Sequence, residues 1–143
     1  MKLCEITQNP LISDPKYESV RKKAKDGILV WRGISPYGPA DPGDFGTGTY
    51  YSTNKFRAKY HGSTNGAKQY HLKFNNPIVL GTSAAYDLAD QYNTLHGSLD
   101  ERRAASLLLN NDLRKAGFDG LISVSKPVRS NFTELEIVDL RIN

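Results

Sequence analysis

Residues 46–60 read GTGTYYSTNKFRAKY, a glycine turn followed by a strand and then directly by a helix. Thr49 to Thr53 is rich in β-branched and aromatic residues, which favour an extended strand. Asn54 comes next and is a predicted N-cap, because its side-chain oxygen can accept a hydrogen bond from the first turn of a helix. We therefore expect a short helix over residues 55–60, and with it a fold that contains both strands and helices.

Upstream of this stretch, the sequence predicts a helix, a strand and a long loop. Segment 14–26 opens with an Asp-Pro pair, ends before Gly27 and has apolar residues at helical spacing, as in an amphipathic helix. Residues 28–31 are apolar and partly β-branched, which indicates a buried strand ending at Arg32-Gly33. Three prolines and four glycines between residues 35 and 48 predict a loop, and long loops in compact domains often carry function.

Downstream, four more strands and one long helix are expected. The predicted strands cover residues 69–74, 78–80, 118–124 and 135–142. Residues 99–116 are rich in leucine and are followed by Gly117, a pattern typical of a helix with a glycine C-cap. No repeat or linker divides the sequence, so we expect a single α+β domain over residues 1–143.

Composition narrows the class of protein. With 38% apolar and 24% charged residues, the 143-residue chain lies outside the range of disordered proteins. No apolar run approaches the ~20 residues that cross a bilayer, and Glu5 stands where a signal peptide would be apolar. We therefore expect a soluble, cytoplasmic protein without a membrane partner. Cys4 is the only cysteine and the three histidines are far apart, so no metal site is expected.

The formal net charge is +4, and the densest basic run is Arg21, Lys22, Lys23 and Lys25. Such a run could contact a nucleic acid. It lies in the predicted helix 14–26, however, where lysine and arginine usually form a solvated face. We favour the solvated face, because so small a net charge is a weak footprint for nucleic-acid binding. A non-catalytic nucleic-acid-binding module that uses this run is kept as an alternative.

Three short motifs place polar groups at strand ends or beside glycine turns, where scaffolds usually carry function. They are Trp31-Arg32-Gly33, the stretch from Gly46 to Thr53, and Glu134-Leu135-Glu136. Taken singly, each has an ordinary explanation as a surface arginine, a turn or a solvated strand face. Because side chains alternate along a strand, both glutamates are expected on the same face.

In their order and spacing, the three motifs resemble the R-S-E class of ADP-ribosyltransferases. In that family an Arg-Gly ends an early strand, a Ser-Thr-Ser motif lies on the next strand, and a Glu-x-Glu begins a late one. The resemblance covers residues 28–140. It implies an α+β fold of two packed, mainly antiparallel sheets flanked by helices, with an NAD cleft between the sheets. The sequence departs from the family at Asn54, which replaces the third residue of the Ser-Thr-Ser motif.

The resemblance also implies which residues bind NAD. Arg32 would bind a phosphate or ribose, and the backbone of Gly33 would approach the nicotinamide carboxamide. Thr53 would support the geometry of the strand. The Gly-x-Gly-x-Tyr element is similar to the H-Y-E class as well, in which a tyrosine stacks on nicotinamide. Whether Ser52, Tyr50 or Tyr51 makes the main contact with nicotinamide stays open.

The resemblance implies three further roles around the late strand. Glu136 would be the catalytic glutamate, oriented by Ser52, because breaking the N-glycosidic bond of NAD leaves an oxocarbenium-like ribose that a carboxylate stabilises. Glu134 would position or deprotonate the acceptor. Phe132, in the preceding loop, is a candidate for acceptor recognition.

We therefore expect a mono-ADP-ribosyltransferase that takes NAD as its substrate, uses no metal and works as a monomer. The Glu-x-Glu pair favours a protein arginine as acceptor, as in a toxin or a phage effector. Two alternatives stay open: an NAD-using relative that modifies a nucleic acid or a small molecule, and the non-catalytic nucleic-acid-binding module. Release of nicotinamide would separate the enzyme from the module, which should ignore NAD and bind with a steep salt dependence.

Overall fold

A computed structural model describes residues 15–33, 43–61, 66–125 and 133–141 and has both strands and helices, as expected. Its helices are α2 (Pro15–Asp26), α3 (Lys55–His61), α4 (Thr82–Tyr92) and α5 (Leu99–Lys115). Its strands are β1 (Ile28–Gly33), β2 (Thr49–Ser52), β3 (Ala67–Leu72), β4 (Pro77–Gly81), β5 (Gly120–Ser125) and β6 (Glu134–Asp139). The α+β class is confirmed, and each predicted strand and helix is present with its ends displaced by a few residues at most.

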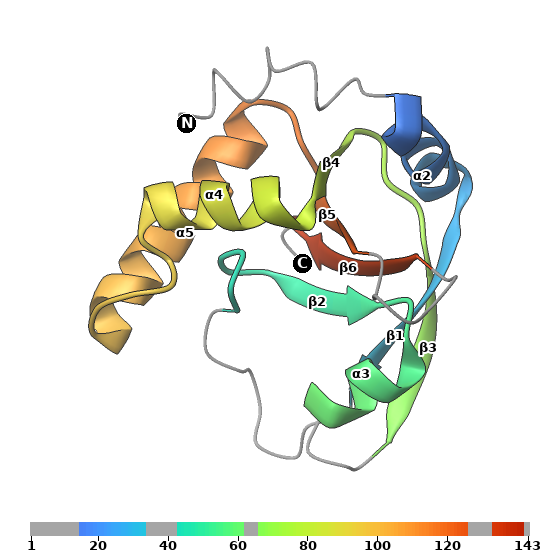
Figure 1. The fold of residues 1–143 in the computed structure, drawn as a ribbon, viewed down its shortest axis with the longest axis horizontal. Coiled ribbons are helices and arrows are strands. Elements are labelled where there is room, and N and C mark those ends of the chain that lie inside the picture. Colours follow the sequence, from blue (N-terminus) through green and yellow to red (C-terminus); the bar gives the residue numbers. More distant parts are fainter. Residues whose placement is uncertain (1–14, 34–42, 62–65, 126–132, 142–143) are drawn as a thin grey trace.

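The described strands form one six-stranded sheet in the order β3-β1-β2-β6-β5-β4 (Figure 1). All neighbouring strands are antiparallel except β4 and β5, which are parallel and are connected through α4 and α5. We expected two packed sheets, whereas these strands belong to one. Its weakest junction lies between β1 and β2, which share the single register pair Trp31–Ser52 while the other neighbours share four to six.

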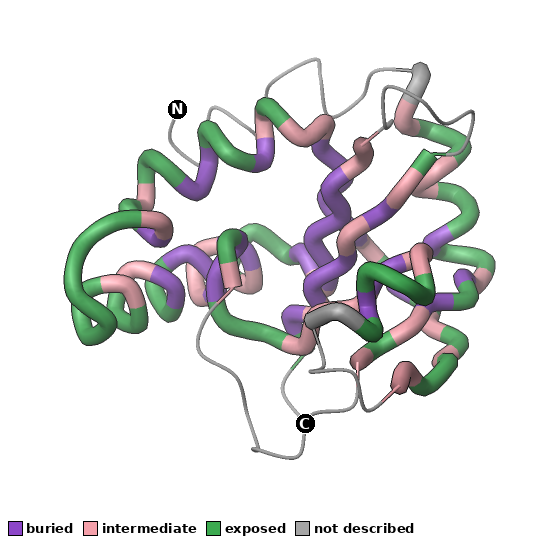
Figure 2. Tube along the Cα trace, turned by 60° about the horizontal axis from the view of Figure 1, so that its bottom comes forward, coloured by how far each residue is buried: buried purple, intermediate pink, exposed green. Residues whose placement is uncertain are grey.

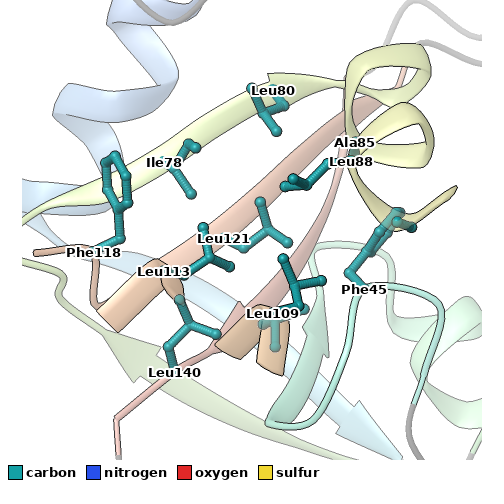
Figure 3. Packing of buried hydrophobic residues seen from close by; sticks show 12 residues of the cluster. Phe45, Ile78, Leu80, Ala85, Leu88, Leu109, Leu113, Phe118, Leu121 and Leu140 are labelled. Atoms are coloured by element: carbon teal, nitrogen blue, oxygen red, sulfur yellow. The ribbon is translucent and has the colours of Figure 1, made fainter. Parts of the chain in front are cut away.

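The two faces of the sheet bury separate hydrophobic clusters. Figure 2 shows the buried residues gathered in the middle of the fold and exposed residues along the outer sides of the helices. Successive residues of a strand point to opposite faces, so Leu121 of β5 packs with α4 and α5 while Ile122 packs on the side of α2. Figure 3 shows the first cluster, where Leu121 of β5 lies near Leu113 and Leu109 of α5. Helices therefore cover both faces of the sheet. A site on the sheet can open only where these helices leave a strand uncovered.

Helix α4 was not predicted from the sequence. Its N-cap is Gly81, which makes no side-chain capping hydrogen bond, so the usual start signal is missing. Its apolar stripe consists of only Ala85, Leu88 and Ala89, which are buried against the sheet and α5. The helix ends at Asn93, which adopts the left-handed conformation with φ 58°.

The turn before β2 explains the Gly-x-Gly-x-Tyr element. The Tyr50 hydroxyl accepts a hydrogen bond from the backbone N–H of Phe45 (3.0 Å) and donates one to the carbonyl of Gly46 (2.6 Å). Gly46 has φ +96°, a backbone conformation that glycine tolerates far better than other residues. A Cβ at Gly46 would also lie 2.7 Å from Asn110 Oδ1 on α5. The motif therefore ties the turn to its own strand and to α5.

Gly46→Ala is expected to destabilise the protein by ~1–3 kcal/mol more than Gly66→Ala, because it adds an overpacked contact to backbone strain. Gly66 is a matched control: its φ is +100°, but a Cβ there would meet nothing within 4 Å. The comparison is made by urea unfolding of the two variants. Equal losses of unfolding free energy would show that contact with α5 is unimportant.

Candidate active site

A pocket of about 300 Å³ opens over the end of β6, on the sheet face that α4 and α5 cover further along. Residues from the strands and from the surrounding helices line it: Ser52, Ser123, Ser125, Glu134, Leu135 and Glu136 from the strands, with Phe45, Arg57, Thr82 and Tyr86 around them. The carboxylates of Glu134 and Glu136 therefore share one concavity with three serine hydroxyls, whereas in the sequence these residues lie in separate motifs.

The strand register sets the central row of the pocket. Glu136 lies directly opposite Ser52 on β2 and opposite Ser123 on β5. Glu134, two residues earlier on β6, lies opposite Ser125. Directly paired residues of antiparallel strands have their Cβ atoms ~4.5–5.5 Å apart, so a hydroxyl flanks each side of the Glu136 carboxylate at close range. The structure thus brings together Ser52, Glu134 and Glu136, the three residues predicted to act in catalysis.

Backbone contacts hold the end of β2 against β6. Ser52 is only 5% exposed, and its Oγ accepts a hydrogen bond from the backbone N–H of Asn54 (3.0 Å). A serine hydroxyl that accepts in this way still has its own proton to donate. Thr53 exchanges two bonds with Leu135: its N–H donates to the carbonyl (3.1 Å), and its Oγ1 accepts from the N–H (2.9 Å). Thr53 therefore fixes the distance between the two strands that carry Ser52 and Glu136.

The Glu134 carboxylate is held by two side chains from the start of α3. Asn54 Nδ2 donates to Oε1 (2.6 Å), and Arg57 Nε lies 3.2 Å from Oε2. Asn54 also caps the helix, since its Oδ1 accepts from the backbone N–H groups of Phe56 (3.0 Å) and Arg57 (3.2 Å). The cap predicted from the sequence is present. Its second function, the orientation of Glu134, was not predicted.

Asn54→Ala is expected to lower the free energy of unfolding by ~1 kcal/mol, the usual effect of losing an N-cap. Asn54→Ser is the matched control, because serine caps a helix well but cannot reach Glu134 as the longer amide does. The alanine variant should therefore be the less stable of the two in urea unfolding. If both variants lost the same stability, the contribution of the cap would be refuted.

The tyrosines that the sequence singled out lie away from the pocket lining. Tyr50 packs against the cluster around α4 and α5, and burial raises the pKa of its hydroxyl above the usual range. Tyr51 lies on the opposite face of the sheet, edge-on to Tyr70 with ring centroids 5.4 Å apart. Tyr86 from α4 lines the pocket instead, with its ring centroid 5.1 Å from that of Phe45. It was missed because α4 itself was missed.

Tyr86 is held in place by an acidic neighbour. Its hydroxyl donates to Asp44 Oδ2 (3.1 Å). Partial burial raises the pKa of this hydroxyl, and the negative charges of Asp44 and Glu136 raise it further. The phenol therefore stays protonated near neutral pH and offers the pocket a fixed aromatic wall beside Glu136.

Arg32 and Gly33, the other predicted NAD-binding residues, are not among the described residues that line the pocket. The register pairs Trp31 with Ser52, so the side chain of Arg32 points to the other face of the sheet. It is exposed there, and its positive charge acts on the Tyr51 hydroxyl. Phe132, the predicted acceptor-recognition residue, lies outside the described residues.

The basic run of the first described helix lies apart from the pocket. Lys22, Lys23 and Lys25 are exposed on α2, while Arg21 donates to Asn76 Oδ1 (2.6 Å). Among the described residues, no helix is long and apolar enough to span a membrane.

The comparisons with known proteins give no relative. No family model matches the chain, and neither the curated proteins nor the solved structures contain a significant match.

Proposed function

We propose that the protein is a mono-ADP-ribosyltransferase that cleaves the nicotinamide–ribose bond of NAD and transfers ADP-ribose to an arginine side chain. One observation carries the proposal. Glu136 lies in register with Ser52, has Glu134 two residues away on the same face, and shares one pocket with both. This is the arrangement that the family resemblance requires of its Ser-Thr-Ser and Glu-x-Glu motifs.

The chemistry needs one carboxylate for each reactant. As the glycosidic bond breaks, positive charge develops on the ribose, and the Glu136 carboxylate stabilises it. Ser52 and Ser123 flank that carboxylate and restrict its orientation. The exposed ring of Tyr86, which packs on the buried Phe45, offers the departing nicotinamide a surface to stack on. Nicotinamide then leaves, and ribose C1 is open to attack by the acceptor.

The size of the pocket supports binding of one end of the dinucleotide. Ligand sites commonly measure ~300–1,000 Å³, and about 300 Å³ is at the lower end of that range. The nicotinamide and its ribose would occupy the pocket, and the adenosine half would extend beyond it. Under this proposal Arg32 and Gly33 do not contact nicotinamide, and a role of Arg32 at the phosphates stays a prediction.

The weak junction between β1 and β2 also supports our proposal that the protein has the ADP-ribosyltransferase fold. The single register pair between β1 and β2 divides the sheet into β3-β1 on one side and β2-β6-β5-β4 on the other. A sheet that is joined by one register pair at this position differs less from the two-sheet arrangement implied by the resemblance than a continuous sheet would. The carboxylate pocket lies next to this junction, on the β2 side.

Incubation with NAD labelled on its adenylate, in the presence of a cell lysate, tests the proposal. We expect label in material that protease digests and nuclease does not. Label in nuclease-sensitive material would replace the arginine acceptor with a nucleic acid. No transfer, together with salt-sensitive binding of nucleic acid, would favour the non-catalytic module.

A further inference from the structure

An arginine of the chain itself already contacts the proposed acceptor carboxylate. Arg57 Nε lies 3.2 Å from Glu134 Oε2, and both residues line the pocket. The guanidinium also lies near enough to Tyr86 for its positive charge to offset part of the rise in the pKa of that hydroxyl. A guanidinium therefore lies against Glu134, inside the pocket that also contains Glu136.

The two partners of Glu134 differ in how firmly they are held. Asn54 is fixed, because its Oδ1 binds two backbone N–H groups of α3 while its Nδ2 binds Glu134 Oε1. Arg57 is free to exchange, because its side chain is 54% exposed while that of Glu134 is 19% exposed. Exposed ion pairs are weak, since water competes for both charges and a long side chain must be ordered. Arg57 can therefore leave Glu134 Oε2 while Asn54 stays bound to Oε1.

We propose that Arg57 occupies, in the resting protein, the position that an acceptor guanidinium takes on Glu134, and that an acceptor binds by displacing it. The identity of the acceptor rests on the proposed function. The contact makes Arg57 a specificity-determining residue: a ligand must offer Glu134 Oε2 a charged donor at least as good as the Arg57 Nε–H that it replaces. A neutral side chain would leave the carboxylate with a poorer partner than Arg57.

The contact also weakens acceptor binding by a predictable factor. When only part of the population is competent to bind, the apparent affinity falls by that fraction. The two charges of an exposed ion pair of ordinary strength are in contact a few times more often than they are apart. Removal of the Arg57 guanidinium should therefore tighten the binding of a small guanidino compound about fivefold.

The test is binding of agmatine, in the absence of NAD, by calorimetry or by NMR titration. Arg57→Gln should bind agmatine about fivefold more tightly than the unaltered protein. Arg57→Lys should fall between the two, because an ammonium still pairs with Glu134 but is hydrated more strongly than a guanidinium. Lys59→Gln is the matched control, since it removes one positive charge from the same exposed helix and should change nothing. The double variant Arg57→Gln, Glu134→Gln should not bind agmatine more tightly than the unaltered protein, because it lacks the carboxylate that receives the guanidinium.

Equal affinities of Arg57→Gln and Lys59→Gln would overturn the inference. So would a failure of Arg57→Gln to bind agmatine in a Glu134-dependent manner while its NMR spectrum shows a folded protein. The proposed function fails by a different observation, the absence of nicotinamide release from NAD. Because agmatine binding is measured without NAD, the two failures are distinguished.

Discussion

Glu136→Gln is expected to lower the rate of ADP-ribose transfer about 100-fold to 1,000-fold, the usual effect of removing one preorganised electrostatic contact from a transition state. The amide has nearly the same size as the carboxylate, so the packing between Ser52 and Ser123 is kept. What is lost is the negative charge opposite the ribose as positive charge develops. The initial rate of label transfer from NAD to an arginine acceptor measures the effect.

Glu18→Gln provides the control for this substitution. Glu18 is exposed on α2, away from the pocket, and undergoes the same chemical change. It should transfer at the unaltered rate. If the folded Glu136→Gln variant transferred ADP-ribose as fast as the control, Glu136 would not be the residue that stabilises the transition state.

The second large effect is expected at Glu134, where a substitution should affect transfer of ADP-ribose to arginine but not, to the same degree, hydrolysis of NAD. Glu134→Gln removes the carboxylate that receives the acceptor, so transfer to arginine should fall ~100-fold or more, as for loss of a general base. Hydrolysis of NAD by water should fall far less, because bond cleavage depends on Glu136. The strand geometry separates the two roles, because the two glutamates share a face but lie ~6.5–7 Å apart along β6.

Nicotinamide release with and without an arginine acceptor measures both activities of the Glu134 variant. Glu136→Gln is the comparison, and it should lose both. A parallel loss of hydrolysis and transfer in the two variants would mean that Glu134 acts on NAD itself. The preference for an arginine acceptor, and the role of Arg57 as its competitor, would then lose their main support.

Features with strong local signals could be predicted from the sequence. Asn54 caps α3 as expected, and α5 ends just before Gly117, which has φ +94°. The alternation of Glu134 and Glu136 on one strand face is also local, because it follows from the geometry of any strand. The expectation that Ser52 lies beside Glu136 came from the resemblance and not from a local pattern; in the structure β2 pairs with β6 and Ser52 lies opposite Glu136.

The remaining features depend on contacts between distant segments. Tyr86 reaches the pocket on α4, a helix held by packing rather than by a capping signal. Arg57 and Glu134 are 77 positions apart in the sequence, so no local pattern predicts their contact. The direction of Arg32 depends on which residue of β1 pairs with Ser52, and a shift of one residue would have reversed it.

The most direct test of the pocket's function is chromatographic measurement of nicotinamide released from NAD by the purified protein without acceptor. We expect a steady release that is proportional to protein concentration and that Glu136→Gln reduces about 100-fold or more. Release no faster than in buffer would contradict the account, and so would release that is the same in the folded Glu136→Gln variant.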